Sequence, residues 1–537
     1  MDSSFTTCLN RLLEGNSPML ANVNTTDIAS AIRLGCRTMC SVFNADDDDV
    51  PFFGSQVWPQ AFLSFSTSAS ESHVPGRHLN ALLNAEDVLG LTLDEGAIDR
   101  HARAAFLSYS GDLPLPLNRE RINGPLHHFY PHSVREGFHA LYALARFRNS
   151  APAVELAERS ICAIQELWHP RKGWDRDRIE SEFEFHSTTF IIGLARAIGP
   201  LVKLHRHTGC SGALDLAIQL AGKATDEFFL PSGAYDRETF GAHTHSTTCV
   251  MSSLAQLADL TRNASLMERV RAFYDNGLND IRDQLGWVIE SSDDGGDPDR
   301  GEVNNTGDIV ETALLLGQWG YPQYYEDAER ILRCHMLPSQ LRDISFICEP
   351  DNPHNEDGKR DVANRHLGAF GFPAPYGHKP IDAERISFNM DIVGGAVASL
   401  CEVYRQAVET TPAGHFINLH FDHETEAVNV ESPYTHSHLR VRAKRPGPFF
   451  IRLPSWVAAD AASVDGLDDP PRLQNGYLLL NQPPVHSWIT IRFELTERDI
   501  VLSHRTRDIR VRLRGDSVAA MSNFGAELTY FPALEEQ

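Results

Sequence analysis

Apolar residues recur at helical spacing over most of the chain. Between about residues 28 and 407, one segment after another places apolar side chains at i, i+3, i+4 and i+7, the spacing that lines one face of an α-helix. Start and stop signals agree with this pattern, since Ser133 precedes Glu136 at capping-box spacing and Pro200 indicates a kink or break. We predict helices over residues 133–147, 153–167, 188–207, 213–229, 247–260, 308–318 and 324–336.

The loops between these predicted helices alternate in character. Some are short and polar, whereas others are long and rich in Gly, Asp, His and Pro, namely residues 113–131, 232–246, 291–306 and 349–380. A barrel of helical hairpins produces this alternation, because one end carries tight turns and the other carries long loops, where functional residues concentrate. The chain has no exact short-period repeat, which disfavours a regular solenoid. We predict a mainly α-helical barrel domain over residues 1–410.

The pattern changes to period two after about residue 411. Apolar and polar residues alternate over 415–419, 438–442, 449–453 and 488–493, and turn formers separate these stretches. Short alternating strands with turns between them are typical of a β-sandwich. We therefore predict a C-terminal β-sandwich domain over residues 411–537. Residues 512–537 stay open, because they could also return to pack on the first domain.

Composition excludes several partners. The chain is 42% hydrophobic and 22% charged, as expected for a folded globular protein. Its 72 acidic residues outnumber 48 basic ones, and the net charge of -24 repels nucleic acid and anionic membrane surfaces. No segment has the roughly 20 apolar residues that a membrane span needs. We expect a small-molecule or glycoside ligand, with no nucleic acid and no membrane as partner, and a homodimer stays an open option.

Cysteine usage and the start of the chain bear on the compartment. Nine cysteines are scattered without CxxC spacing, and the first residues lack the cationic and apolar regions of a secretory signal. This pattern predicts reduced thiols and a cytoplasmic protein. Cys36 and Cys40 could share a helical face and bind metal, but we interpret them as two buried small hydrophobic side chains. No metal and no cofactor are predicted.

Three groups of polar residues lie in or beside the long loops. Arg77 and His78 follow a Pro-Gly turn at a helix start, where backbone N–H groups can bind an anion or a sugar hydroxyl. Glu136 and His139 stand one turn apart and form either a polar ligand-binding wall or ordinary ion-pair groups. The third group is the pair His243 and His245. A lone HxH pair predicts a metal site poorly, so we propose these histidines as substrate-binding residues.

A further histidine falls in an alternating stretch. His186 follows two glutamates in residues 182–186, so it is either a pocket residue or part of a short strand.

The fourth group is an acidic, glycine-rich loop that ends in a helix. Glu290 and Glu302 flank the loop, and Asp308 falls in the first turns of the helix. Two carboxylates across a pocket are the minimum equipment for cleaving a glycoside, because one protonates the leaving oxygen and the other acts as base or nucleophile. Trp287 would be a sugar-stacking platform in this interpretation. The alternative is a solvated acidic turn, with Asp308 as a helix cap and Trp287 in the core.

Several stretches together resemble the β-L-arabinofuranosidase-like proteins of glycoside hydrolase family 127. They are the order of the helical segments and the stretches 301–304, 324–330 and 450–457, and the resemblance covers residues 180–510. It implies an (α/α)6 barrel, the six-hairpin toroid of many glycosidases, followed by β-sandwich modules. It also implies that Glu290 corresponds to the family's acid/base glutamate and that His243 corresponds to a substrate-contacting histidine.

The chain departs from that family at the metal and nucleophile positions. The family's zinc-bound glutamate falls on Glu302, but Asn304 stands where the Glu-x-Cys motif has its cysteine. The family's paired cysteines, one of them the nucleophile, would lie within residues 387–391, which read Ser-Phe-Asn-Met-Asp. Zinc bound by three thiolates and a carboxylate, and a cysteine nucleophile, are therefore excluded by residue type.

Three hypotheses follow from these residues. The first is a glycoside hydrolase-like enzyme that uses Glu302, Glu290 and Asp308 for acid/base chemistry without metal. The second is an isomerase, cyclase or lyase of secondary metabolism that reuses the barrel pocket. The third is a non-catalytic carbohydrate-binding protein, which the missing cysteines favour. We prefer the first, because the acidic loop supplies the carboxylates that glycoside cleavage needs.

Overall fold

The computed structural model describes residues 19–293, 295–467 and 471–534. Within these residues, six helices form a closed inner ring, in which each helix contacts the next and the last contacts the first. The helices of the ring are α3 (Val74–Leu89), α5 (Val134–Arg148), α8 (Ile198–Thr208), α11 (Thr244–Thr261), α13 (Val303–Gln318) and α16 (Met390–Ala407).

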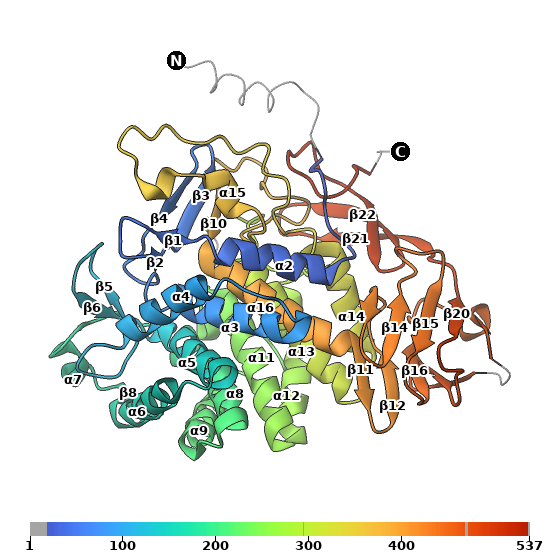
Figure 1. The fold of residues 1–537 in the computed structure, drawn as a ribbon, viewed down its shortest axis with the longest axis horizontal. Helices are drawn as coiled ribbons and strands as arrows, with labels where there is room; N and C mark the ends of the chain where they lie inside the picture. Colours follow the sequence, from blue (N-terminus) through green and yellow to red (C-terminus); the bar gives the residue numbers. More distant parts are fainter. Residues whose placement is uncertain (1–18, 294, 468–470, 535–537) are drawn as a thin grey trace.

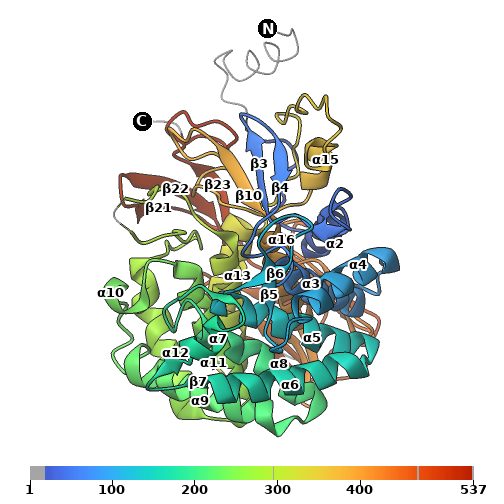
Figure 2. The same cartoon turned by 90° about the vertical axis from the view of Figure 1, so that its left-hand side faces the viewer.

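A second layer of helices packs around this ring (Figures 1 and 2). Each outer helix contacts an inner helix next to it in the chain or, for the first one, α16 and α3. The described chain therefore forms an (α/α)6 barrel, as predicted. The outer helices are α2 (Ile28–Met39), α4 (Glu95–Ser108), α6 (Ala151–Leu167), α9 (Ser211–Glu227), α12 (Ala264–Asp275) and α14 (Gln323–Ile331).

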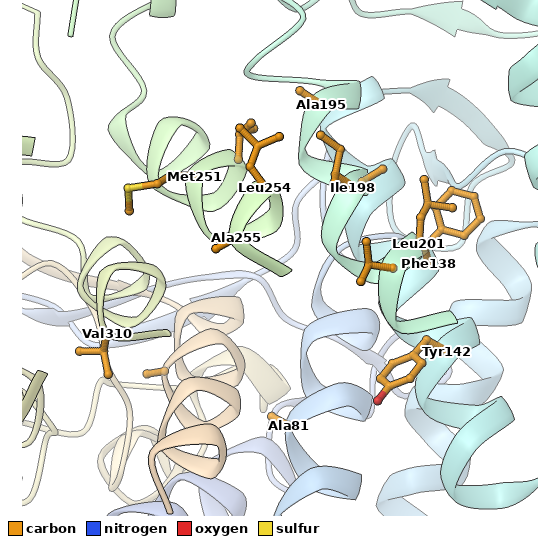
Figure 3. Close-up of a cluster of buried hydrophobic side chains, with 14 of the residues drawn as sticks. Ala81, Phe138, Tyr142, Ala195, Ile198, Leu201, Met251, Leu254, Ala255 and Val310 are labelled. Atoms are coloured by element: carbon orange, nitrogen blue, oxygen red, sulfur yellow. The ribbon is translucent and has the colours of Figure 1, made fainter. Parts of the chain in front are cut away.

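The hydrophobic core of the barrel lies within and between the two helical layers. Phe138 on α5, Leu201 on α8 and Leu254 on α11 are fully buried in this core, and Figure 3 shows their side chains on neighbouring inner helices. Burying each such side chain stabilises the fold by about 1.5 to 3 kcal/mol. These apolar contacts hold the inner helices in place, and the opposite faces of the inner helices line the barrel axis.

Local signals explain where several helices begin. The side chains of Asp27, Asp94, Ser150 and Asn263 accept hydrogen bonds from backbone N–H groups in the first turns of α2, α4, α6 and α12. Two predicted signals have a different role. The Ser133 side chain makes no cap hydrogen bond, because the 3-10 turn Pro131–Ser133 runs directly into α5. Pro200 lies in the first turn of α8, where a missing N–H costs nothing, so it kinks no helix.

The β-sandwich begins immediately after α16. Its two five-stranded sheets enclose a separate apolar cluster that includes Ile417, Val441, Ile451 and Ile489. In the first sheet β12 and β16 pair in parallel, while the other neighbours are antiparallel. The first sheet runs in the order β11 (Val408–Thr411), β12 (Gly414–Ile417), β16 (Phe449–Arg452), β19 (Tyr477–Leu480) and β18 (Arg472–Gln474). The second runs in the order β13 (His423–Glu424), β14 (Val428–Glu431), β15 (Leu439–Ala443), β20 (Trp488–Arg492) and β17 (Ser463–Asp465).

The last strands leave the sandwich and join N-terminal strands over one end of the barrel (Figure 2). Ile509, Val511 and Leu513 share an apolar cluster with Phe52 and Phe388. The open question about residues 512–537 is thus answered for the described part of that segment, which packs on the first domain. The sheets of this cap are β10 (Ile386–Asn389), β3 (Gly54–Trp58) and β4 (Phe62–Ser64), and β21 (Glu497–Ser503), β22 (Asp508–Arg514) and β23 (Ser517–Met521).

Shorter elements complete the described chain. One three-stranded sheet has the order β5–β6–β9 and stands beside the start of α5. No helix among the described residues is long and apolar enough to cross a membrane. The bounds are β1 (Phe43–Asn44), β2 (Val50–Pro51), β5 (Leu117–Arg119), β6 (Leu126–Phe129), β7 (Trp168–His169), β8 (Gly173–Trp174), α7 (Arg176–Glu180), β9 (Glu184–Phe185), α10 (Arg237–Phe240) and α15 (Val362–His366).

Cysteine chemistry differs in one place from the expectation. Cys348 is disulfide-bonded, so the prediction that all thiols are reduced is wrong. Cys36 and Cys40 are free thiols on or next to α2, and Cys36 is buried in the core, in keeping with a packing role. The cytoplasmic location stays a prediction.

Candidate active site

The axis of the barrel is lined by polar side chains. On α13, Asn304, Asp308 and Glu311 follow one another at i, i+4 and i+7, so they form one stripe that faces the axis. Other inner helices add Arg135, His139, Lys203, His245, Ser252 and Ser399. These residues line a cavity of about 30 Å³, which holds one or two water molecules and excludes a sugar ring. A substrate therefore has to approach from the mouth above this cavity.

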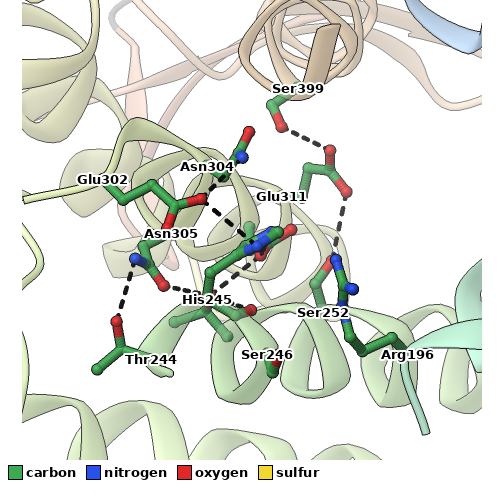
Figure 4. A network of polar contacts seen from close by, with 12 residues as sticks. Arg196, Thr244, His245, Ser246, Ser252, Glu302, Asn304, Asn305, Glu311 and Ser399 are labelled. Carbon is green, nitrogen blue, oxygen red and sulfur yellow. Dashed lines mark hydrogen bonds and ion pairs between the residues drawn. The ribbon is translucent and has the colours of Figure 1, made fainter. Parts of the chain in front are cut away.

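Glu302 lies at the top of this stripe, immediately before α13. Its Oε1 accepts a hydrogen bond from Asn304 Nδ2 at 2.9 Å and lies 3.5 Å from His245 Nδ1 (Figure 4). Burial raises the pKa of Glu302 to about 8, and the negative charges of Glu290 and Asp391 add to the rise. A carboxyl group with this pKa is protonated at neutral pH and can donate a proton.

Asp308 is the second buried acid, and His245 stands between the two. Asp308 Oδ2 accepts a hydrogen bond from Thr248 Oγ1 at 3.0 Å and lies 3.4 Å from His245 Nε2. Burial raises the pKa of Asp308 to about 7, against the opposing charge of Arg135. Burial and the nearby charges of Arg77 and Arg196 hold the pKa of His245 far below its ordinary value, so the imidazole is neutral. A neutral imidazole has one N–H and one lone pair, which fits one ionised and one protonated carboxyl group.

Glu136 has the opposite character, because three arginines surround it. Its Oε1 lies 2.9 Å from Arg196 Nη2, 3.0 Å from Arg135 Nη1 and 3.2 Å from Arg77 Nη2. Burial alone would raise the pKa of Glu136, but these guanidinium groups, together with His73, hold it well below the ordinary value. Glu136 is therefore a fixed negative charge that orders the floor of the site and does not exchange protons near neutral pH.

A second fixed charge, Asp391, joins α16 to α3. Asp391 Oδ2 lies 3.1 Å from His73 Nε2 and 3.4 Å from Arg77 Nε. Burial opposes ionisation, yet Arg77 and His73 lower the pKa of Asp391. The His73 ring stacks on His132 with centroids 5.3 Å apart, and His132 meets the edge of His243 at 5.4 Å. A row of imidazoles thus runs along the mouth from α3 to α11.

Glu290 reaches the same region from the acidic loop. Ile289 pairs with Gly301 in an antiparallel bridge, which brings the two ends of the loop together and sets Glu290 near Glu302. Glu290 forms an ion pair with Arg300, whose Nη1 donates to Ser387 Oγ at 3.1 Å. The Glu290 side chain is 30% exposed, whereas Glu302 is buried. The loop therefore places a solvent-accessible, ion-paired carboxylate beside a buried, protonated one.

The structure brings most of the predicted site residues together, but not all. Glu302, Glu290, Asp308, His243, His245, Glu136 and Arg77 converge at the top of the barrel axis, and His139 lines the narrow cavity below. The sequence reasoning did not select Asp391 or Arg196, which complete the cluster.

Three predicted substrate-binding residues lie elsewhere. His78 is fully buried and contacts the Met390 carbonyl at 2.7 Å through Nε2 and His101 at 3.3 Å through Nδ1, so it joins α3 to its neighbours. The Trp287 ring is 3% exposed, and its Nε1 donates to the Pro373 carbonyl at 2.9 Å, which leaves no free face for a sugar. His186 comes directly after β9, in the sheet beside α5. The short strand that the sequence analysis gave as the alternative for this stretch is therefore present.

The residues at the family's zinc position do not fit a thiolate site. Asn304 donates a hydrogen bond to Glu302 Oε1, so this oxygen is already engaged. Asn389 and Met390 offer no thiolate. Among the described residues, His243, His245 and Glu302 do have ligand atoms within 4.8 Å of one another. Zinc bound by three thiolates is nevertheless not available to this chain.

The fold defines a class of protein, an (α/α)6 barrel followed by a β-sandwich. Solved structures with this fold are similar to the chain. A β-L-arabinofuranosidase of glycoside hydrolase family 127 from Geobacillus stearothermophilus T6 has a TM-score of 0.55 and 14% identity, over 96% of this chain and 83% of its own. A second β-arabinofuranosidase of that family has a TM-score of 0.54 and 14% identity, over 96% and 81%.

These likenesses establish the fold. No protein-family model matches the chain, and no curated protein matches it by sequence. A third solved structure, described as a glycoside hydrolase, has a TM-score of 0.55 and 13% identity, over 94% of this chain and 83% of its own. The chain thus has the fold of the family 127 enzymes, as the resemblance implied, while its chemistry has to be argued from its own residues.

Proposed function

We propose that the protein is a glycoside hydrolase that cleaves its substrate by carboxylate acid/base chemistry without a metal. The observation that carries this proposal is the contrast between two neighbouring carboxyl groups. Glu302 is buried with a pKa of about 8, whereas Glu290 is partly exposed and ion-paired with Arg300. Neighbouring carboxyl groups in contrasting environments are the arrangement that assigns acid and base roles in glycosidases.

In this mechanism Glu302 protonates the glycosidic oxygen as the bond to the anomeric carbon breaks. Glu290 acts on the other side of the bond, either as the base that activates water or as the nucleophile. His245 connects Glu302 to Asp308, so the single proton of this pair can move through the imidazole and lie on Glu302 when the bond breaks. The water that is consumed in the reaction supplies the proton that restores the pair. His243, part-buried at the mouth beside His132, is placed to bind a sugar hydroxyl.

The arginine cluster has a supporting role in this mechanism. Arg77 and Glu136, both proposed from the sequence to bind substrate, form an ion pair with each other. Arg77 also forms an ion pair with Asp391 and contacts His245. They therefore act as positioning residues that hold the floor of the site. His139 lines the water-sized cavity below and does not reach a substrate at the mouth.

Leaving-group dependence tests the acid role directly. Aryl glycosides, the arabinofuranosides among them, are assayed with good and poor leaving groups for the parent protein and for Glu302→Gln. An acid is needed mainly for poor leaving groups, so we expect the variant to lose roughly 10²- to 10⁴-fold on these and far less on dinitrophenyl glycosides. The parent activity should fall as pH rises through about 8. Equal activity of Glu302→Gln on poor leaving groups would refute the assignment.

Glu290→Gln separates the second role. We expect it to lose turnover with both kinds of leaving group, because base or nucleophile is needed in either case. The same exchange at an exposed position of α6, Glu155→Gln, serves as the matched control and should leave kcat unchanged.

A carbohydrate-binding role without catalysis is the second candidate, and one cavity favours it. A cavity of about 450 Å³ lies between the barrel and the first sheet of the sandwich. Strand register sets Glu409, Phe416, Phe450 and Leu479 in one row across that sheet, facing the cavity. Aromatic rings with a few polar groups in a cavity of this size suit a sugar. Tyr477 also lines this cavity. If Tyr477→Ala abolishes sugar binding while the double variant Glu290→Gln/Glu302→Gln leaves it unchanged, this second function holds.

A further inference from the structure

A group of histidines and one carboxylate stands apart from the barrel cluster, on the sheet β5–β6–β9. Strands β6 and β9 pair in parallel, with His128 opposite Glu184 and Phe129 opposite Phe185. The two phenylalanines are buried in the core of the barrel. Because side chains alternate along a strand, His128 and Glu184 both face away from that core. His186 lies two residues after Glu184 and so returns to the same face.

The donor atoms on this face converge. His128 Nδ1 lies 2.9 Å from His186 Nε2 and 3.3 Å from Glu184 Oε2, and His186 Nε2 lies 3.4 Å from Glu184 Oε1. In a tetrahedral zinc site, bonds of 2.0 to 2.2 Å separate the ligand atoms by roughly 3.3 to 3.5 Å. The three side chains already stand close to these separations.

We propose that His128, Glu184 and His186 bind a divalent zinc-like metal ion. The ligand set of two imidazoles and one carboxylate suits first-row transition metals and disfavours magnesium and calcium, which prefer oxygen ligands only. The fourth position is open to water or to His127, whose Nε2 lies 3.8 Å from Glu184 Oε2.

The surroundings favour this site over a chance meeting of polar groups. The His186 ring stacks flat on Tyr130, with centroids 4.1 Å apart and planes 4° apart, which fixes the direction of Nε2. Glu184 is about half exposed, which leaves a path for the ion from solvent.

Such an ion would join two segments that the chain itself holds together weakly. Strands β6 and β9 share only two paired positions, and they lie more than fifty residues apart in the sequence. Tyr130 and His132 follow β6 directly, and His132 belongs to the row of imidazoles at the barrel mouth. The metal would therefore stabilise the rim beside the candidate active site, and this role does not depend on the proposed glycosidase activity.

Metal binding is measured on the full chain after treatment with a chelator. Zn²⁺ is titrated by calorimetry, and Co²⁺ is added as a spectroscopic probe, whose visible absorption is strong only in a tetrahedral site. We expect one tight equivalent and an increase of Tm with added Zn²⁺. The variant His186→Ala should weaken binding by at least about 100-fold, since loss even of outer partners costs 10- to 100-fold.

Two further variants make the result decisive. Glu184→Gln changes an exposed side chain by one atom, so it keeps the fold and should still weaken Zn²⁺ binding by about 10-fold or more. His243→Ala removes a histidine of the other candidate group and should leave the affinity unchanged. The proposal is overturned if 1 mM Zn²⁺ gives no binding, or if His243→Ala abolishes binding while His186→Ala and Glu184→Gln retain it.

Discussion

Replacing Glu302 with glutamine should change how the stability of the protein depends on pH. In the unfolded chain this carboxyl group titrates near 4.5, whereas in the folded protein its pKa is about 8. Because the folded-state pKa is raised, the group opposes folding only once pH exceeds 4.5. The free energy of unfolding is therefore highest below pH 4.5, and the part that depends on protonated Glu302 is lost as pH rises through about 8. Glutamine is neutral throughout and carries no such dependence.

The magnitude follows from the size of the shift. A displacement of about 3.5 pH units at 1.36 kcal/mol per unit gives an upper bound of about 5 kcal/mol. The Glu302→Gln variant should therefore gain stability relative to the parent by as much as this between pH 4.5 and pH 8. Urea unfolding followed by circular dichroism, at half-unit steps from pH 5 to pH 9, measures the difference as a shift of the midpoint. Parallel midpoint curves for variant and parent would refute the reasoning.

A neighbouring carboxylate supplies a control of opposite sign. Asp391 has a lowered pKa in the folded protein, so its contribution to stability is present above about pH 3.8 and is lost only in acid. The variant Asp391→Asn should be less stable than the parent from pH 5 to pH 9, and the loss should shrink as pH rises, because removing this charge also lowers the pKa of Glu302. If Asp391→Asn and Glu302→Gln showed the same pH dependence, the two environments could not differ as described.

Two further changes test the packing of the site. Glu136→Gln removes the charge that faces three arginines, two of them buried, and we expect a loss of about 3 to 5 kcal/mol in the free energy of unfolding, measured by urea titration; a loss below about 1 kcal/mol would contradict this. Gly76→Ala places a Cβ 1.8 Å from the Glu136 carbonyl oxygen, so it should cost about 3 kcal/mol or more, whereas Gly222→Ala, with nothing within 4 Å, should stabilise α9 by up to about 1 kcal/mol. Equal melting temperatures for these two alanine variants would argue against the close contact of α3 and α5.

Sequence patterns predicted the architecture because each layer leaves a local trace. The helical spacing of apolar residues reflects contact between inner and outer helices, and the alternation after residue 411 reflects strands that face the sandwich core. The acidic loop was also visible, since Glu290 and Glu302 flank a run of glycines and aspartates. Its hairpin geometry then brought both carboxyl groups to the mouth.

The rest of the cluster depends on contacts between distant segments. Asp391 meets His73 across 318 positions of the chain, and no local pattern encodes that meeting. Arg196 is a single cation between apolar residues in the sequence. This pattern predicts that the side chain is buried and needs a partner, but it does not identify the partner. Trp287 was misjudged for a related reason. Gly301 has no side chain, so the indole packs directly on the backbone of the loop, with Nε1 2.4 Å from where a Cβ would stand.

The charges around the barrel axis set how many protons the site holds. Three guanidinium groups, those of Arg77, Arg135 and Arg196, meet two carboxylates that stay ionised, Glu136 and Asp391. One positive charge is left over in this cluster, so one further negative charge is favourable there and a second is not. Glu302 and Asp308, joined by a neutral His245, are the groups that can supply it. Near neutral pH the pair therefore holds a single proton, which is the state that a recycling general acid requires.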